Sequence, residues 1–257
     1  MNEKELLHSA IDLWKSEGRL IRLPEGKTVV FVGDTHGDTE ATERVFSRFL
    51  DTEAVIVFLG DYVDRGPDSE GNLRLLLETK LAQPERVFLL MGNHEGWKVA
   101  SFSPADFWEG LPPGRRRLYS EALSFLPLAA LSPHGVLGLH AALPDIQSID
   151  DIDRIELGSA DWRKATWGDW ADVPGYAIDP GVFSRPSYGR DYFYKVMERL
   201  NLHILVRSHQ PHAPPYLFGD RCLTIFTSIA YGGKRRVAVL PPDRAISTAH
   251  DLEILYL

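Results

Sequence analysis

The side chains that could carry out chemistry in this sequence follow apolar runs, at the point where each run ends. They are carboxylates, an amide and imidazoles: Asp34 and His36, Asp61 and Asp64, Asn93 and His94, His140, and His209. A single Asp after a strand is usually a turn residue or a helix cap, and a single His is more often structural than a ligand. Five apolar runs that all end in such residues favour a shared site. Carboxylates and imidazoles with few thiols suit Mn²⁺, Fe or Zn²⁺ better than a soft metal.

The first apolar runs are predicted to be strands of an α/β sheet. Three short and continuous runs, 28–34, 54–61 and 86–93, are separated by helical patterns at 39–50 and 69–82. Strands that alternate with helices indicate βαβ units and a sheet that is covered on both faces. Because sites in open α/β sheets form at the carboxyl ends of strands, we expect the polar residues at one edge.

The second half of the chain is richer in strands, which indicates mixed or antiparallel pairing. Its predicted strands are 136–140, 203–209, 222–231, 236–240 and 252–257. At the other end, the apolar spacing of residues 3–17 predicts an amphipathic helix. The sequence has no repeat or low-complexity linker, so residues 1–257 are predicted to form one domain.

Two stretches interrupt this pattern, 103–117 and 157–187. The first is rich in Pro and aromatic residues, and the second contains Trp162, Trp167 and Trp170. We expect surface insertions that shape a binding mouth, with core packing as the alternative for each tryptophan.

Composition excludes several classes of protein. The formal net charge is −8 and basic residues form only short runs such as 115–117, which argues against a nucleic-acid binder. No segment approaches the roughly 20 apolar residues of a membrane span, so no membrane partner is expected. The single cysteine, Cys222, rules out an internal disulfide and favours the reducing cytoplasm.

Three motifs at the strand ends resemble the signature of the metallophosphoesterases, and in particular of the PPP-type serine/threonine protein phosphatases of prokaryotes. They are GDTHG (33–37), GDYVDRG (60–66) and GNHE (92–95). Further segments follow in the family's order: LSFLPLAAL (123–131), HAAL (140–143), RSHQ (207–210) and the predicted strand that ends at Tyr231. The resemblance implies an α/β sandwich with two mixed central sheets flanked by helices. It also implies hydrolysis of phosphate monoesters, above all phosphoserine and phosphothreonine in proteins.

The resemblance further implies two divalent metal ions, with Mn²⁺ favoured and Fe or Zn²⁺ as alternatives. Carried over position by position, the ligands of the first ion are Asp34, His36 and Asp61. Those of the second are Asp61 as a bridge, Asn93, His140 and His209. A hydroxide held between the ions would attack phosphorus in line.

The remaining roles concern protons and the phosphate group. His94 is the expected general acid for the leaving alkoxide, and Asp64 would orient it. Candidates for binding the substrate phosphate are Arg65, Asn93, Arg185 and Tyr231. Glu95 either supports its neighbours or is a solvated residue at the start of a helix.

The second phosphate-binding arginine has three candidates, of which Arg185 is preferred. The segment PGVFSRPSYG, which contains Arg185, matches the family poorly, and Arg190 and Arg207 are rivals.

Two other functions compete with protein phosphatase activity. Diadenosine tetraphosphate hydrolases share the scaffold, but they tend to have Asn and Asp where this chain has Asp64 and Glu95. A catalytically dead phosphopeptide-binding module would have lost a ligand or the acid, and every such position is filled here.

Overall fold

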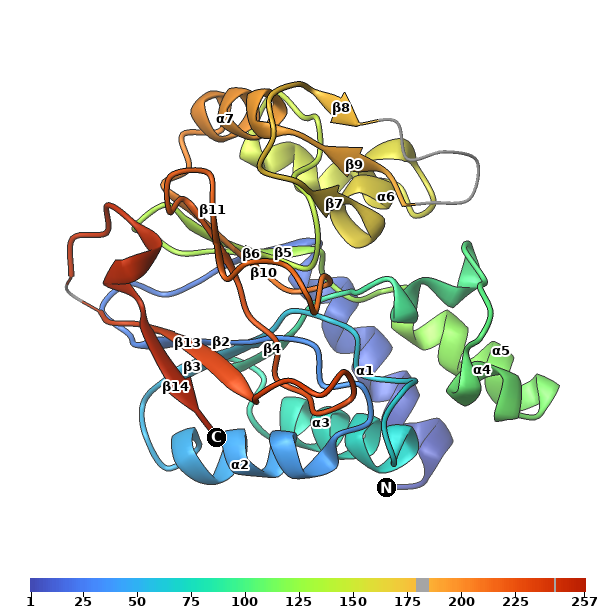
Figure 1. The fold of residues 1–257 in the computed structure, drawn as a ribbon. Helices are drawn as coiled ribbons and strands as arrows, with labels where there is room; N and C mark the ends of the chain where they lie inside the picture. The colour runs from blue at the N-terminus through green and yellow to red at the C-terminus, as the bar shows by residue number, and fades with distance from the viewer. Residues whose placement is uncertain (179–184, 243) are drawn as a thin grey trace.

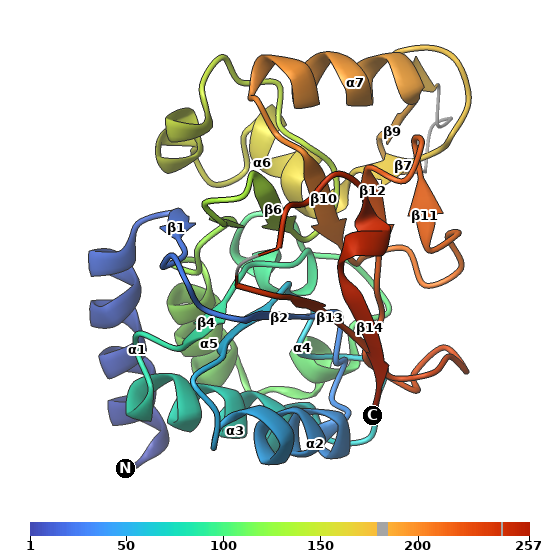
Figure 2. The ribbon, with the colours of Figure 1, turned by 90° about the vertical axis from the view of Figure 1, so that its left-hand side faces the viewer.

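Two mixed β-sheets lie one above the other at the centre of the protein, and helices cover their outer sides (Figure 1). The computed structural model describes residues 1–178, 185–242 and 244–257. Seen from the side, α2 and α3 lie below the lower sheet, and α6 and α7 lie above the upper one (Figure 2).

The helices and strands have the following bounds. The α-helices are α1 (Glu3–Glu17), α2 (Thr39–Phe49), α3 (Ser69–Ala82), α4 (Asp106–Gly110), α5 (Pro113–Leu123), α6 (Ala160–Trp167) and α7 (Arg190–Arg199). Short 3-10 helices are η1 (His94–Lys98), η2 (Ile149–Arg154) and η3 (Ala249–Asp251). The five-stranded sheet has the order β14 (Glu253–Tyr256), β13 (Arg236–Leu240), β2 (Val29–Val32), β3 (Val55–Phe58) and β4 (Val87–Leu89). The six-stranded sheet has the order β1 (Leu20–Arg22), β5 (Ala129–Leu131), β6 (Val136–Leu139), β10 (Ile204–Arg207), β12 (Cys222–Thr224) and β11 (Tyr216–Leu217). A small third sheet has the order β7 (Asp169–Trp170), β9 (Ser187–Tyr188) and β8 (Ala177–Ile178).

The parallel pairs of both sheets direct strand ends toward the same region. β2, β3 and β4 are parallel neighbours joined through α2 and α3, as the alternating pattern predicted. In the other sheet β10 pairs in parallel with both β6 and β12, and β1 pairs in parallel with β5, while the pairs β5–β6 and β11–β12 are antiparallel. The predicted fold class, two mixed sheets flanked by helices, is confirmed.

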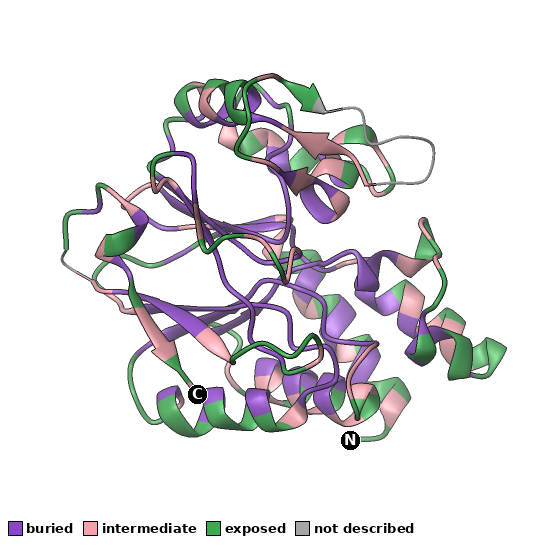
Figure 3. Cartoon of the chain, in the orientation of Figure 1, coloured by how far each residue is buried: buried purple, intermediate pink, exposed green. Residues whose placement is uncertain are grey.

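Burial on both faces explains why the central strands are continuously apolar. All four residues of β2 are buried. Phe31 faces the layer between the sheets, with Val57 and Val206. Its neighbours on the strand belong to the other apolar cluster, which includes Val45 of α2 and Leu76 of α3. Figure 3 shows the central strands as a buried layer within a more exposed shell.

The strand predicted over 222–231 is much shorter in the structure. β12 ends at Thr224, and the chain then crosses from one sheet to β13 in the other. During this crossing Thr227 Oγ1 accepts a hydrogen bond of 2.8 Å from the N–H of Gly33. The apolar run at 222–231 therefore contains a buried connection between the sheets as well as a strand. An apolar sequence alone does not distinguish the two.

The two stretches that interrupt the predicted pattern, 103–117 and 157–187, both contain regular secondary structure. Residues 103–117 include α4 and the start of α5, and residues 157–187 include α6 and the small sheet. Trp162 and Trp170 are buried, with 1% and 3% of their surface exposed, so core packing is the correct interpretation for both. None of the helices within the described ranges has the length and apolar character needed to cross a membrane.

Candidate active site

Five strand ends bring buried polar side chains together between the two sheets. Asp34, Asp61 and Asn93 follow β2, β3 and β4, while His140 and His209 follow β6 and β10. Each of the five is at most 4% exposed. Strands from both sheets therefore contribute to one site, at their carboxyl ends.

The first group of ligand atoms surrounds His36. Its Nε2 lies 3.7 Å from Asp34 Oδ2 and 3.8 Å from Asp61 Oδ2. Its Nδ1 is 2.9 Å from the carbonyl oxygen of Val63 and donates to it. The proton is thereby fixed on Nδ1, which leaves the lone pair of Nε2 facing the two carboxylates.

The second group surrounds His140. Its Nε2 lies 3.1 Å from Asn93 Oδ1, 3.1 Å from His209 Nδ1 and 3.5 Å from Asp61 Oδ2. The other ring nitrogen, Nδ1, donates to the carbonyl of Leu59 at 3.0 Å. Asp61 Oδ2 thus lies within 4 Å of an imidazole nitrogen of each group.

The chemistry of this donor set fits divalent cations. Among the described residues, Asp34 Oδ2 is buried without a hydrogen-bond partner. Burial and repulsion from Asp61 raise the pKa of Asp34 to about 7. Burial opposes protonation of His140, but Asp61 and Asp34 outweigh it and raise the pKa of His140 to about 9. Buried, unpartnered charge is costly, and a bound cation would remove that cost.

Two glycines are required for this close approach. A Cβ on Gly92 would lie 2.2 Å from Asp61 Oδ1, and one on Gly60 would lie 2.4 Å from the nitrogen of Gly92. Three of the predicted ligand residues also have positive φ angles, 44° at His36, 56° at Asp61 and 67° at His209. Such strain persists only where the surroundings hold the backbone firmly.

Glu95 supplies part of that support. It is fully buried, and its Oε2 accepts from the N–H of Asp61 at 2.8 Å and of Gly92 at 3.0 Å. Its Oε1 accepts from the N–H of Tyr62 at 2.8 Å. The alternative of a solvated glutamate is therefore wrong, because its carboxylate ties the loops after β3 and β4 together.

His94 and Asp64 form a buried pair beside the two ligand groups. His94 Nδ1 is 2.6 Å from Asp64 Oδ2, and Asp64 Oδ1 accepts from the N–H of Phe107 at 2.8 Å. Burial works against the cationic form of His94, but Asp61 and Asp64 outweigh it and raise its pKa. Its Nε2 lies 3.9 Å from Asp61 Oδ2. The ring can therefore hold a proton and present it beside the two groups of predicted ligands, around His36 and His140, which together form the ligand cluster.

Arg185, unlike its rivals, borders the ligand cluster. Its Nη1 lies 3.0 Å from His209 Nε2, and its Nε lies 3.3 Å from Asp169 Oδ2. Arg207 is fully buried and donates to the side chain of Gln210, and Arg190 pairs with Asp172 at 2.7 Å.

Tyr231 lies beside His36, and Arg65 lies next to Tyr231. The backbone N–H of Arg65 donates to Asp106 at 3.0 Å, and its Nη1 donates to the carbonyl of Pro104 at 2.8 Å. The Tyr231 ring is 38% exposed, and its centroid is 5.6 Å from that of His36.

Two residues at the site were not found from the sequence. Asp169 pairs with Arg185, and its Oδ1 lies 3.4 Å from His209 Nε2. The Phe102 ring lies 4.6 Å from the His94 ring and 5.4 Å from the Trp167 ring. Asp169 belongs to the stretch 157–187, and Phe102 directly precedes the stretch 103–117. Neither stretch has a periodic pattern that indicates which side chains are buried.

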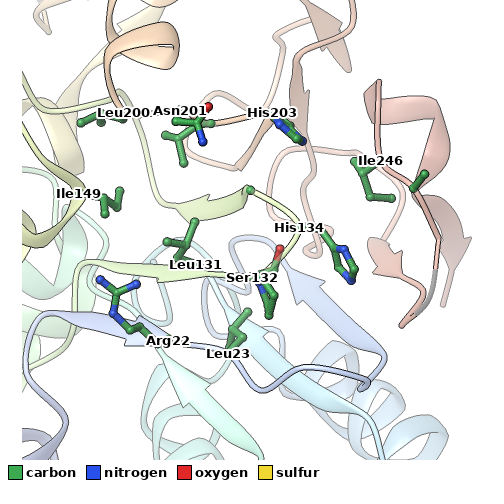
Figure 4. Close-up of a pocket in the computed structure, with 14 residues that line it drawn as sticks. Arg22, Leu23, Leu131, Ser132, His134, Ile149, Leu200, Asn201, His203 and Ile246 are labelled. Carbon is green, nitrogen blue, oxygen red and sulfur yellow. The ribbon is translucent and has the colours of Figure 1, made fainter.

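Two cavities differ in their relation to the cluster. One of about 630 Å³ is lined by Arg185 and His209. A larger one, of about 790 Å³, lies at the amino ends of β6 and β10, where Figure 4 shows His134 and His203 among its walls. No predicted site residue lines the larger cavity. The candidate active site is therefore identified by its buried side chains, although another cavity is larger.

Comparison with known proteins identifies the family of this chain. Residues 27–213 match the family model described as calcineurin-like phosphoesterase. The chain is 30% identical over 230 residues to "Serine/threonine-protein phosphatase T" of Trypanosoma brucei brucei (strain 927/4 GUTat10.1). That match covers 82% of this chain and 48% of the relative, so the chain spans about half of the relative's length.

Solved structures show the same fold. A protein serine/threonine phosphatase from Saccharomyces cerevisiae, described as similar to human phosphatase PP5, superposes with a TM-score of 0.82 at 22% identity. The alignment covers 98% of this chain and 88% of the yeast chain. A putative diadenosine tetraphosphatase gives a TM-score of 0.60 at 20% identity, over 93% of this chain and 98% of its own. The family model spans most of the sequence and every predicted site residue except Tyr231, and the chain belongs to the calcineurin-like phosphoesterase family.

Proposed function

We propose that this protein is a metal-dependent phosphoprotein phosphatase that hydrolyses phosphoserine and phosphothreonine esters. The observation that carries the proposal is the position of Asp61, whose Oδ2 lies 3.8 Å from His36 Nε2 and 3.5 Å from His140 Nε2. One carboxylate between two groups of buried ligands suits a pair of ions that share a bridge. The 30% identity to a serine/threonine-protein phosphatase supports protein substrates.

The proposed ligands follow the two groups. Asp34, His36 and Asp61 would hold one ion, and Asp61, Asn93, His140 and His209 the other. Mn²⁺ is the proposed ion, because oxygen and imidazole ligands suit it. When bound, such ions supply Lewis acidity toward the phosphate and a nucleophile at neutral pH. The amide of Asn93 adds a ligand oxygen without adding negative charge where a phosphate dianion must bind.

The other side chains bind phosphate and move a proton. Arg65 and Arg185 would hold the outward oxygens of the phosphate, and Tyr231 would contact the substrate from the exposed side. His94 would donate its Nε2 proton to the leaving serine oxygen, since Asp64 holds the opposite nitrogen at 2.6 Å. We further propose that residues 1–257 form one catalytic domain. A cytoplasmic location is proposed because the single thiol, Cys222, is buried and has no disulfide partner in this sequence.

A comparison of three substrates tests this function. The purified protein is stripped with a chelator, and phosphate release is then measured with and without added Mn²⁺. The substrates are a phosphoserine peptide, p-nitrophenyl phosphate and diadenosine tetraphosphate. We expect the peptide and p-nitrophenyl phosphate to be hydrolysed only with metal. Efficient hydrolysis of diadenosine tetraphosphate without peptide hydrolysis would replace the proposal with the nucleotide activity.

A further inference from the structure

A groove extends outward from the candidate active site between β7 and the loop that follows β10. It has a volume of about 630 Å³, and Arg185 and His209 line it where it meets the ligand cluster. Trp170 and Leu217 contribute apolar walls, and Tyr231 lines it as well. Because Arg185 borders both the groove and the cluster, the groove adjoins the cluster directly.

Most polar groups in the groove are already engaged. Asp172 Oδ1 pairs with Arg190 Nε at 2.7 Å, and its Oδ2 accepts from the N–H of Phe218 at 3.1 Å. The side-chain amide of Gln210 bonds both backbone groups of Trp170, at 2.8 Å and 3.3 Å. Among the described lining residues, Asp172 is thus the one carboxylate, and it already has partners.

Among the lining residues that the structure describes, the remaining polar groups are cationic or neutral. Arg185 carries a permanent positive charge, and its nearby partner Asp169 already pairs with it at 3.3 Å. His212 is exposed at the rim, and a histidine is neutral or cationic but never anionic. Pro211, Ala213 and Pro214 complete this wall with small apolar surfaces.

We propose that the groove binds the side chain next to the phosphorylated residue of a peptide substrate and selects an apolar side chain over a basic one. This inference rests on the proposed phosphatase function. One residue of extended chain spans about 3.3–3.6 Å, so the neighbour of a residue held at Arg185 reaches the groove. An apolar side chain would be removed from water against the accessible surfaces of Pro211, Ala213 and Pro214, beside the buried Trp170 and Leu217. A lysine would meet Arg185 and His212 and find the one carboxylate already paired.

Matched phosphoserine peptides test the selectivity. They differ in one position, Leu or Lys, directly before or directly after the phosphoserine, and kcat/KM is measured for each. At one of the two positions we expect Leu to exceed Lys by about 10-fold or more, the discrimination that a single pocket contact supplies. p-Nitrophenyl phosphate, which has no neighbouring residue, is the reference substrate.

Two groove variants and one matched control locate the effect. His212→Asp adds a carboxylate that can pair with a lysine of the peptide. It should therefore lower the ratio of kcat/KM for the Leu peptide to that for the Lys peptide about 5-fold or more. Ala213→Trp fills the groove and should lower kcat/KM for the Leu peptide about 10-fold. His203→Asp makes the same charge change at the amino end of β10, in the cavity of Figure 4, and should leave the ratio unchanged. All three variants should hydrolyse p-nitrophenyl phosphate like the wild type.

The outcomes separate the inference from the function beneath it. Equal kcat/KM for the Leu and Lys peptides overturns the inference and leaves the phosphatase function standing. A ratio that His212→Asp does not move, or that His203→Asp moves as much, also overturns it. Hydrolysis of p-nitrophenyl phosphate without hydrolysis of any phosphopeptide contradicts the proposed function, and the groove inference fails with it.

Discussion

At the scale of single residues, His94 has the contacts of a proton donor rather than of one more ligand. His36, Asp61 and His94 could together surround a cation, since their ligand atoms lie within 4.8 Å of one another. However, Asp64 holds His94 Nδ1 at 2.6 Å and helps to raise its pKa, which stabilises the protonated ring. A metal ligand needs the neutral ring, so the pair favours acid catalysis.

His94→Asn tests that role. We expect kcat on a phosphoserine peptide to fall by about 10²–10⁴, the range for a positioned general acid, with the metal content unchanged. The loss should be smaller on p-nitrophenyl phosphate, whose leaving group needs little protonation. Metal analysis of the variant is the check, because loss of an ion together with activity would make His94 a ligand.

Arg185→Ala tests the phosphate contact, with Arg190→Ala as its matched control. Arg185 faces His209, whereas Arg190 is engaged with Asp172. Arg185→Ala should lower kcat/KM about 10-fold or more, which equals about 1.4 kcal/mol, and should weaken inhibition by inorganic phosphate. Arg190→Ala should match the wild type in kcat/KM for p-nitrophenyl phosphate and in its inhibition by inorganic phosphate. The reverse pattern would assign the phosphate contact to Arg190.

At the scale of elements, Glu95 joins the ends of β3 and β4. Its carboxylate accepts three backbone N–H groups within 3.0 Å. In Glu95→Gln one oxygen becomes an amide group, which cannot accept from the N–H of Tyr62. We predict a loss of about 2–4 kcal/mol in the free energy of unfolding, since hydrogen bonds to charged groups contribute about 1.5–3 kcal/mol and a buried N–H is left unpaired. Urea unfolding measures it, with exposed Glu109→Gln as the control. Equal stability of the two variants would contradict the supporting role.

Arg235 fastens the loop that carries Tyr231. It donates to both oxygens of Asp38, at 2.9 Å and 2.8 Å, and Asp38 also accepts from the N–H of Ile229 at 3.1 Å. Arg235→Ala should free this loop and raise KM for a phosphopeptide about 3- to 10-fold, with kcat nearly unchanged. Arg74→Ala removes an exposed pair with Glu78 at 2.8 Å within α3 and serves as control. A fall in kcat alone would show that the loop does not position the substrate.

The elements also show what local sequence can and cannot predict. β2, β3 and β4 were predictable because each is a short, continuously apolar run. Their contribution to the site was predictable because Asp34, Asp61 and Asn93 follow these runs. Asp169 was not, because the two-residue strand β7 has no period of its own and is held through the backbone of Tyr188 and the amide of Gln210. The groove depends in the same way on segments distant in sequence.

At the scale of the whole molecule, the site joins the two sheets. Asp34, Asp61 and Asn93 come from one sheet and His140 and His209 from the other, so their buried charges lie at the junction. Ions that bind there stabilise the folded state by mass action, since the unfolded chain has no assembled site. We predict that a chelator lowers Tm and that Mn²⁺ restores it in the wild type. Asp61→Asn should show a smaller increase in Tm than Asp34→Asn, because Asp61 contacts both groups. Equal increases would argue against a bridge.

The most direct test of the central claim is a titration of the stripped protein with Mn²⁺, in which bound metal and phosphate release from a phosphoserine peptide are measured together. Our account predicts two bound ions per chain, phosphate release that rises with their occupancy, and weaker binding of both ions together with loss of phosphate release in Asp61→Asn. Full peptide hydrolysis by the stripped protein, or two tightly bound ions without hydrolysis of any phosphate monoester, would contradict it.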